Sequence, residues 1–294
     1  MLKNKYKSPI VIAEIGCNHM GKISLAKEFI DISKNFCNLK YVKFQKRHPK
    51  SLLSKKEYYT PHPVPENSFG KTYGKHREKL EFNITQHKYL KKYCESKKIT
   101  YSTSVWDLKS AKEISRINPK FIKIGSATNS NYKVLNYLLK NYHGKIHVSL
   151  GMTNKKEEET LINLFFKHNR NKDLILYACT SAYPVETKDT CLLEVSRLVE
   201  KYKKKNLAMD IGFSGHHKGI ALDVAAFALG ANYIERHFTL DRTWKGTDHS
   251  ASLEPDGIRK LKRNLEETFK ALKFKNKEIL EVEKASRNKL KYKG

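Results

Sequence analysis

The chain has 294 residues, of which 39% are hydrophobic and 11% aromatic. This apolar share is enough for a globular core and excludes an intrinsically disordered chain. The net charge of +28 comes from basic residues spread along the whole sequence. We interpret them as a solvated surface and expect no nucleic-acid partner, although such a charge would attract an anionic substrate.

The sequence gives no indication of export or of a membrane span. The N-terminus is charged, and the apolar stretch 9–16 contains Glu14 and is too short for a signal-peptide core. No stretch approaches the roughly 20 apolar residues that a spanning helix needs. The five cysteines are odd in number and lack metal-type spacing, which favours a reducing compartment. We therefore expect a soluble, cytoplasmic protein with no membrane partner.

Short β-branched or aromatic runs alternate with longer helical patterns. The runs predict strands at 9–16, 41–45, 99–103, 121–125, 146–150, 174–179, 208–214 and 233–238. Apolar spacing predicts helices at 24–34, 85–97, 108–117, 131–141, 155–169, 192–204, 219–229 and 255–272. Strict alternation predicts a parallel sheet, and eight such units predict a single-domain α/β protein, a closed (β/α)₈ TIM barrel.

Two segments fall outside this alternation. Segment 46–79 contains four of the eight prolines and several tyrosines, and we expect a long active-site loop there. The alternative is a disordered insertion. We expect the barrel to occupy residues 1–275, and the basic tail 276–294 to be an extra helix or partly disordered.

Polar residues gather where the predicted strands end, which is where barrel enzymes place their active sites. They include Glu14, Lys43, Gln45, Lys123, Ser126, Ser149, Ser181, Ser214, His216 and His237. Packing does not explain so many polar groups on one face, because buried polar groups need partners. Lys43 and Lys123 alternate with apolar neighbours and should point inward, where two lysines and nearby serine hydroxyls would bind a phosphate.

Two histidines, His216 and His237, follow adjacent predicted strands. With nearby oxygen ligands, two imidazoles can hold a divalent metal and leave positions free for substrate. The spacing alone does not exclude a structural or acid–base histidine. His217 competes as a ligand, but successive residues point in different directions, so we expect only one of His216 and His217 to bind.

At these residues the chain resembles the sialic acid synthase family, which makes N-acetylneuraminate and related nonulosonates. The motifs, in the family's order, are AEIGCNH at 13–19, VKFQ at 42–45, YGKHR at 73–77, KIGS at 123–126, SLGM at 149–152, CTSAYP at 179–184, FSGHH at 213–217 and LGANYIERHFTLDR at 229–242. The resemblance covers roughly residues 9–272. The ordered set is much more specific than any single motif.

The resemblance implies a barrel enzyme that condenses phosphoenolpyruvate with N-acetylmannosamine or a related sugar aldehyde, giving a sialic acid-type nonulosonate and phosphate. It implies phosphoenolpyruvate binding at Lys43, Lys123, Ser126, Ser149 and Ser214, to which we add Ser181. It implies a divalent metal on His216 and His237, with Mn²⁺ expected before Mg²⁺ or Co²⁺. Gln45, Tyr183 and Asp248 map near the sugar, and Glu14, Lys43, Lys123 and Asp248 are the expected catalytic residues. The family also tends to form homodimers.

Three departures from the family pattern concern the acceptor. We expect the chain to lack the C-terminal antifreeze-like domain of many members. Thr128 stands where the family usually has a glutamate after Lys-Ile-Gly-Ser, and Ser181 stands where it often has an asparagine. The general base is therefore open between metal-bound water, Glu14 and phosphate. We expect segment 46–79, with Tyr73, His76 and Arg77, to serve as the lid, and Arg77 to bind the sugar.

Two alternatives stay open. The first is an octulosonate or heptulosonate synthase with the same barrel chemistry, although the paired histidines and the motif at 229–242 favour the nonulosonate branch. The second is a catalytically silent barrel that acts as a binding subunit. Thr128 favours this reading, whereas retention of both lysines and both histidines disfavours it.

Overall fold

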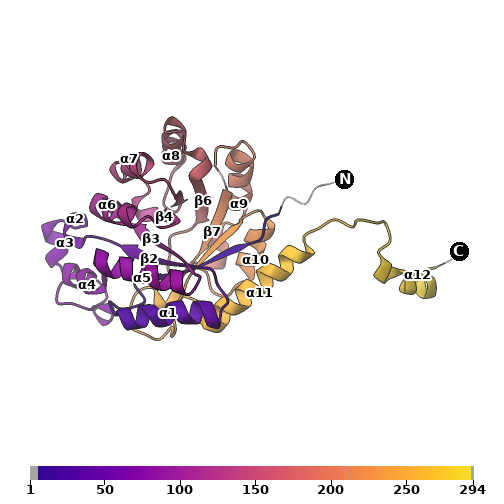
Figure 1. The fold of residues 1–294 in the computed structure, drawn as a ribbon, viewed down its shortest axis with the longest axis horizontal. Helices are drawn as coiled ribbons and strands as arrows, with labels where there is room; N and C mark the ends of the chain where they lie inside the picture. The colour runs from indigo at the N-terminus through magenta and orange to yellow at the C-terminus, as the bar shows by residue number, and fades with distance from the viewer. Residues whose placement is uncertain (1–5, 209, 293–294) are drawn as a thin grey trace.

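The computed structural model of the chain describes residues 6–208 and 210–292. Met209, inside the predicted strand 208–214, and the ends of the predicted barrel and tail, 1–5 and 293–294, lie outside the described residues. Eight parallel strands pair in chain order, and the eighth pairs with the first to close a barrel. Helices surround this barrel (Figure 1), which confirms the predicted (β/α)₈ TIM fold.

The strands are β1 (Ile10–Gly16), β2 (Tyr41–Lys46), β3 (Thr100–Val105), β4 (Phe121–Ile124), β5 (Lys145–Ser149), β6 (Leu174–Cys179), β7 (Asp210–Gly215) and β8 (Tyr233–His237). The surrounding helices are α1 (Ile23–Asn35), α5 (Ile84–Ser96), α6 (Leu108–Ile117), α7 (Tyr132–Asn141), α8 (Lys155–Lys167), α9 (Leu193–Leu198), α10 (Ala221–Ala228) and α11 (Pro255–Ala271). The helix predicted at 192–204 differs, because α9 continues as a π-helical turn, Val199–Lys203. There the buried Tyr202 donates its hydroxyl hydrogen to Glu158.

Alternation along the strands builds two layers inside the barrel. Ile12, Phe121, Ile175, Tyr177 and Tyr233 form an apolar cluster toward the amino ends of the strands. Side chains two positions further along a strand point to the same face. The inward positions above this layer therefore carry the charged residues Glu14, Lys123 and Glu235, and Lys43 likewise follows Tyr41, which packs against the cluster.

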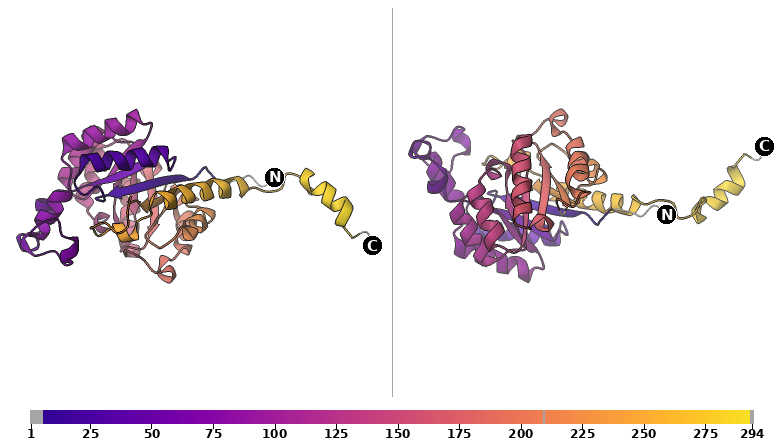
Figure 2. Two further views of the ribbon diagram at one scale, coloured as in Figure 1. Left: turned by 90° about the horizontal axis from the view of Figure 1, so that it is seen from below. Right: turned by 90° about the horizontal axis from the view of Figure 1, so that it is seen from above.

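Segment 46–79, expected as a loop, is partly helical. It contains α2 (Pro49–Leu52), α3 (Lys55–Tyr59), a 3₁₀ turn (Pro65–Asn67) and the start of α4 (Tyr73–Leu80). A capping box between Ser54 and Glu57 starts α3, and the Thr72 hydroxyl caps α4. These short helices project beyond the carboxyl ends of the strands (Figure 2).

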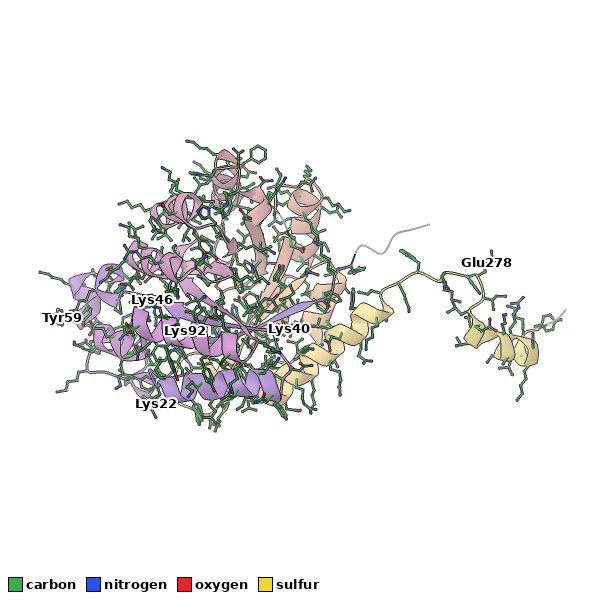
Figure 3. All side chains as sticks on the ribbon, in the orientation of Figure 1. Lys22, Lys40, Lys46, Tyr59, Lys92 and Glu278 are labelled. Atoms are coloured by element: carbon green, nitrogen blue, oxygen red, sulfur yellow. The ribbon has the colours of Figure 1, made fainter. Side chains whose placement is uncertain are left out.

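The C-terminal segment leaves the barrel at its other end. The chain extends away after α11, and α12 (Lys284–Leu290) has no buried residue; the arm and the short helices above lie at opposite ends of the molecule (Figure 2). Exposed lysines such as Lys22, Lys40 and Lys92 lie on the outside of the barrel (Figure 3). Among the residues described, no helix combines the length and apolar character that crossing a bilayer requires.

A buried ion pair joins β8 to α10, and further hydrogen bonds hold the segment before that helix. The Arg236 guanidinium donates to the Asp223 carboxylate and to the backbone oxygens of His217 and Gly219, and both charged side chains are fully buried. Removing one partner of such a pair leaves an uncompensated buried charge. We expect this pair to fix the connection that follows His216.

We predict that Arg236→Met lowers the free energy of unfolding by about 3–5 kcal/mol, because the Asp223 carboxylate loses its cation. Urea unfolding followed by circular dichroism measures the change. The control is Arg259→Met on the exposed face of α11, where the expected change is within about 0.5 kcal/mol. Equal stability of the two variants would contradict the prediction.

Candidate active site

Cavities lie at both ends of the barrel. The cavity at the amino ends of the strands is the larger, about 610 Å³, and has a mostly apolar lining that includes Phe227, Leu272 and Phe274. The cavity at the carboxyl ends is about 270 Å³ and is lined by charged side chains from several strands, among them Lys43, Lys123 and Glu235. Because the barrel strands bring buried titratable groups of both signs together in this second cavity, it is the candidate active site.

Two lysine ammonium groups form the floor of this cavity. The Nζ atom of Lys43 lies 2.5 Å from Oε2 of Glu14 and 3.8 Å from Oε1 of Glu235. The Nζ atom of Lys123 lies 3.2 Å from Oε2 of Glu235 and 3.3 Å from the centre of the Tyr177 ring. Glu235 therefore bridges both lysines, and all four charged side chains are buried.

The two carboxyls of the floor differ in pKa. Burial raises the pKa of Glu14 to about 8, and Lys43 offsets this only in part. Burial also acts to raise the pKa of Glu235, but Lys123 and Lys43 outweigh it and lower the value to about 2. Glu235 is thus firmly ionised, whereas Glu14 can carry a proton near neutral pH. Two ammonium groups face one permanent carboxylate, an arrangement that favours an incoming anion.

Serine hydroxyls and open backbone surround these lysines. Ser126, Ser149 and Ser214 line the cavity, and the Ser214 hydroxyl lies 3.3 Å from Oε1 of Glu235. Gly125 also lines the cavity, and no atom lies within 4 Å of the position that a Cβ atom would take there. Such donors beside two lysines can hold the oxygens of a phosphate.

Ser181 and Thr128 do not line the cavity. Ser181 is partly exposed and packs against Gly151, with its Oγ 4.0 Å from Sγ of Cys179. Thr128 is nearly buried in the 3₁₀ turn Ser126–Thr128, where its Oγ1 donates to the Gly125 carbonyl at 3.5 Å. Thr128, which stands in place of the expected glutamate, therefore forms a hydrogen bond within its own turn and does not line the cavity.

The paired histidines come together as the sequence predicts. The His216 and His237 ring centres are 5.3 Å apart. Nδ1 of His216 donates to the Thr180 carbonyl at 2.9 Å, so Nε2 is the nitrogen that can bind a metal. Burial acts to lower the pKa of His216, but a hydrogen bond with Cys179 outweighs it and raises that pKa, so a metal would replace this contact. Nδ1 of His237 is buried without a hydrogen-bond partner and lies 3.8 Å from Oδ2 of Asp248. Burial lowers the pKa of His237 to about 4, which favours the neutral imidazole that binds metals.

These donors fit a divalent metal. An orphaned imidazole nitrogen, a second imidazole with its other nitrogen held by a carbonyl, and a carboxylate form an open ligand set. No three His, Cys, Asp or Glu side chains in the described part of the chain are already gathered as a complete metal site. His217 does not compete, because it is buried behind the cavity against Arg236.

The predicted sugar-binding residues line the outer part of the cavity. Tyr183 is 50% exposed, and its ring lies 4.3 Å from the His216 ring and 5.7 Å from the His237 ring, centre to centre. Gln45 donates its amide hydrogen to Cys17. Asp248 and Arg77 complete this group, with Arg77 reaching the cavity from α4.

Several lining residues were missed from the sequence. They are Arg47, His62, Trp106 and Glu235. Glu235 was detectable, because it follows Tyr233 by two positions and shares its inward face. The residues of segment 46–79 were not, since their reach into the cavity depends on how short helices fold back over the barrel.

The chain is similar in sequence to a known family and to several characterised proteins. The sequence model of the NeuB family matches residues 29–277. The chain is 37% identical over 280 residues to N-acetylneuraminate-9-phosphate synthase of Homo sapiens, covering 95% of this chain and 76% of the human protein. It is 32% identical over 267 residues to N,N'-diacetyllegionaminic acid synthase of Campylobacter jejuni, covering 90% and 78%.

A solved structure is also similar. The sialic acid synthetase of Leptospira borgpetersenii serovar Hardjo-bovis superimposes with a TM-score of 0.80 at 28% identity, covering 98% of this chain and 94% of that chain. The fold and sequence comparisons agree over almost the entire described barrel. The chain therefore belongs to the NeuB family.

Proposed function

We propose that this chain is a phosphoenolpyruvate-dependent synthase that joins phosphoenolpyruvate to N-acetylmannosamine or a related sugar aldehyde, giving a sialic acid-type nonulosonate and phosphate. The observation that carries the proposal is the pair of buried lysines beside two metal-type histidines in one cavity. The relatives are named as synthases of N-acetylneuraminate 9-phosphate and of diacetyllegionaminic acid, so an octulosonate or heptulosonate product is not favoured.

The reaction forms one carbon–carbon bond and releases phosphate. C3 of phosphoenolpyruvate attacks the aldehyde carbon, positive charge develops at C2, and water adds there. The tetrahedral intermediate then breaks its C2–O bond and expels phosphate. Lys43 and Lys123 hold the phosphate and stabilise the charge that develops as it leaves. Ser126, Ser149 and Ser214 complete this binding region, and Ser181 joins it only if its side chain turns inward.

Residues at the other side of the cavity bind the acceptor. His216 and His237, with Asp248, would hold a divalent metal, for which we propose Mn²⁺ before Mg²⁺ or Co²⁺; when bound, it acts as a Lewis acid toward the acceptor carbonyl. Gln45, Tyr183 and Arg77 contact the sugar, and Asp248 orients its hydroxyls. Glu14 holds the Lys43 ammonium in place. A homodimer, a cytoplasmic location and the division into a 1–275 barrel and a 276–294 tail stay predictions.

We predict that the purified protein with Mn²⁺ releases phosphate from phosphoenolpyruvate when a hexosamine acceptor such as N-acetylmannosamine or its 6-phosphate is added. EDTA and His237→Ala should each lower the rate at least roughly 100-fold, because several kcal/mol of carbonyl polarisation are lost. A phosphate-release assay measures this. Absence of both release and phosphoenolpyruvate binding would refute the proposed function.

We predict that Lys123→Met weakens phosphoenolpyruvate binding by roughly 30-fold or more, because a buried charge-assisted contact worth about 2–5 kcal/mol is lost. Isothermal titration calorimetry measures the dissociation constant. Lys120→Met removes an equal charge from the exposed residue just before β4 and should leave binding within about threefold. Equal effects of the two changes would show that net charge, and no specific site, governs binding.

We predict that ¹⁸O placed at the bridging C2–O position of phosphoenolpyruvate leaves with phosphate, since the proposed chemistry breaks the C2–O bond. Mass spectrometry of both products follows the label. Label found in the sugar acid would establish P–O cleavage instead and would overturn this step of the proposal.

A further inference from the structure

The outer wall of the active-site cavity has its own chemical character. We call it the lid wall and define it by His62, Tyr73, His76 and Arg77 of the segment between β2 and α5, with Trp106 just after β3. All five side chains line the same cavity as the lysine floor. The proposed mechanism uses only Arg77 among them, so the remaining four need an explanation.

Arg77 is held in a fixed position without a carboxylate. Its guanidinium carbon lies 4.6 Å from the centre of the Tyr73 ring and 5.8 Å from that of Trp106. Nη2 donates to the Tyr73 hydroxyl at 2.6 Å, and within residues 6–208 and 210–292 no ion pair involves Arg77. Since a guanidinium has five N–H donors, several stay available for a planar anionic group.

Arg47 gives an internal contrast. It also lines the cavity and stacks near Trp106, at 5.3 Å. However, its Nε lies 2.6 Å from the Glu81 carboxylate, and Glu81 also accepts from the Arg47 backbone N–H. The charge of Arg47 is therefore satisfied within the protein, whereas that of Arg77 is not.

The two lid-wall histidines add further donors. Nδ1 of His62 accepts from the backbone N–H of Val64 at 3.0 Å, and Nδ1 of His76 accepts from that of Phe69 at 3.1 Å. Each neutral ring must then carry its proton on Nε2. Neither Nε2–H finds an acceptor in the described part of the chain. The rings are adjacent, with centres 4.4 Å apart.

The lid wall thus presents donors without matching acceptors. Burial, and then the positive charges of nearby residues including Arg47 and Arg77, lower the pKa of His76 to about 4, so the field of these cations reaches the wall. A sugar hydroxyl both donates and accepts, and it would leave such a surface only partly satisfied. A phosphoryl group accepts only, carries up to two negative charges and matches the guanidinium fork.

The lid wall also lies at the correct end of the acceptor. β3, which leads to Trp106, is opposite β7 in an eight-stranded barrel numbered in chain order. The histidines proposed to lie at the aldehyde follow β7 and end β8. A sugar bound by its aldehyde at the histidines therefore extends its far end toward the lid wall.

We propose that the lid wall binds a phosphoryl group carried by the acceptor at the end remote from its aldehyde, so that this enzyme uses a sugar phosphate in preference to a neutral sugar. The inference rests on the proposed function and deepens it, because it names the chemical class of the acceptor. Arg77 supplies the ionic contact, and the Nε2–H groups of His62 and His76 supply the remaining donors.

The test compares N-acetylmannosamine with N-acetylmannosamine 6-phosphate as acceptors. Because the phosphoryl group adds charge-assisted hydrogen bonds, we expect wild-type kcat/KM to favour the 6-phosphate by roughly 100-fold or more. Arg77→Met should lower kcat/KM for the 6-phosphate by roughly 100-fold, mainly through KM, whereas the loss for the neutral sugar, which Arg77 also contacts, should be at least about tenfold smaller. Arg77→Lys, which keeps the charge but loses the fork, should lie between.

The matched control is Lys75→Met, which removes one positive charge from the same helix at an exposed residue paired with Glu78. It should leave the preference unchanged. The KM for phosphoenolpyruvate should stay at the wild-type value in all three variants, which also shows that they fold. Calorimetric titration of the 6-phosphate into wild type and Arg77→Met tests the site without turnover.

The outcomes separate the two proposals. A wild-type enzyme that prefers the neutral sugar, or an Arg77→Met variant that loses both acceptors equally, would overturn the phosphoryl site while the synthase function stands. Failure to bind phosphoenolpyruvate and to release phosphate with every acceptor would instead reject the synthase. Loss of 6-phosphate binding on Arg77→Met, with phosphoenolpyruvate binding kept, supports the lid-wall site.

Discussion

The buried charge inside the barrel is the constraint on which the site depends. Lys43 and Lys123 point into a closed sheet, where an unpaired ammonium would be very costly. Glu235 bridges both lysines and Glu14 pairs with one of them, so the interior can hold the charges. Apolar side chains of similar volume would often be at least as stable there. The ion pairs are therefore better explained by the anion they can receive than by their contribution to stability.

The alternation of side chains along the strands determines where these charged groups lie. The residues below the floor close the barrel with apolar contacts, and the next inward position on β1, β2, β4 and β8 carries a charge. Because each charged side chain stands on a regular strand, its position is fixed by backbone hydrogen bonds and needs no flexible loop. Tyr177 adds to this support, since its ring lies directly under the Lys123 ammonium.

The same periodicity explains why much of the site could be predicted from the sequence. Lys43 and Lys123 were identified because a lysine stands out in an apolar strand, and the histidines because they end neighbouring strands. Glu235 follows the same rule but was overlooked between Ile234 and Arg236. Local patterns place residues on strands, but they do not give the partners of those residues.

The lid wall shows where sequence reasoning ends. The sequence does not show whether the charge of Arg47 or of Arg77 is paired. In the structure Glu81 neutralises Arg47, whereas Arg77 is held by aromatic rings. That difference arises from long-range folding of α4 and its neighbours, which proline content alone had suggested to be an irregular loop. Ser181 illustrates the reverse case, because its place just after a predicted strand suggested the phosphate region, whereas the backbone turns it toward Gly151.

Surface charges attract anions in general, whereas incompletely paired charges in the cavity can select among them. Surface lysines raise the local concentration of any anion, and they cannot distinguish a phosphate on one end of a sugar from one on another molecule. Discrimination needs donors that stand in fixed positions and whose charge the protein does not fully neutralise. The floor meets this condition through two lysines that share Glu235, and the lid wall meets it through Arg77 and two imidazoles of fixed tautomer. The cavity thus offers separate anion-binding regions at its floor and its outer wall, which an enol phosphate and a phosphorylated acceptor can occupy together without competing.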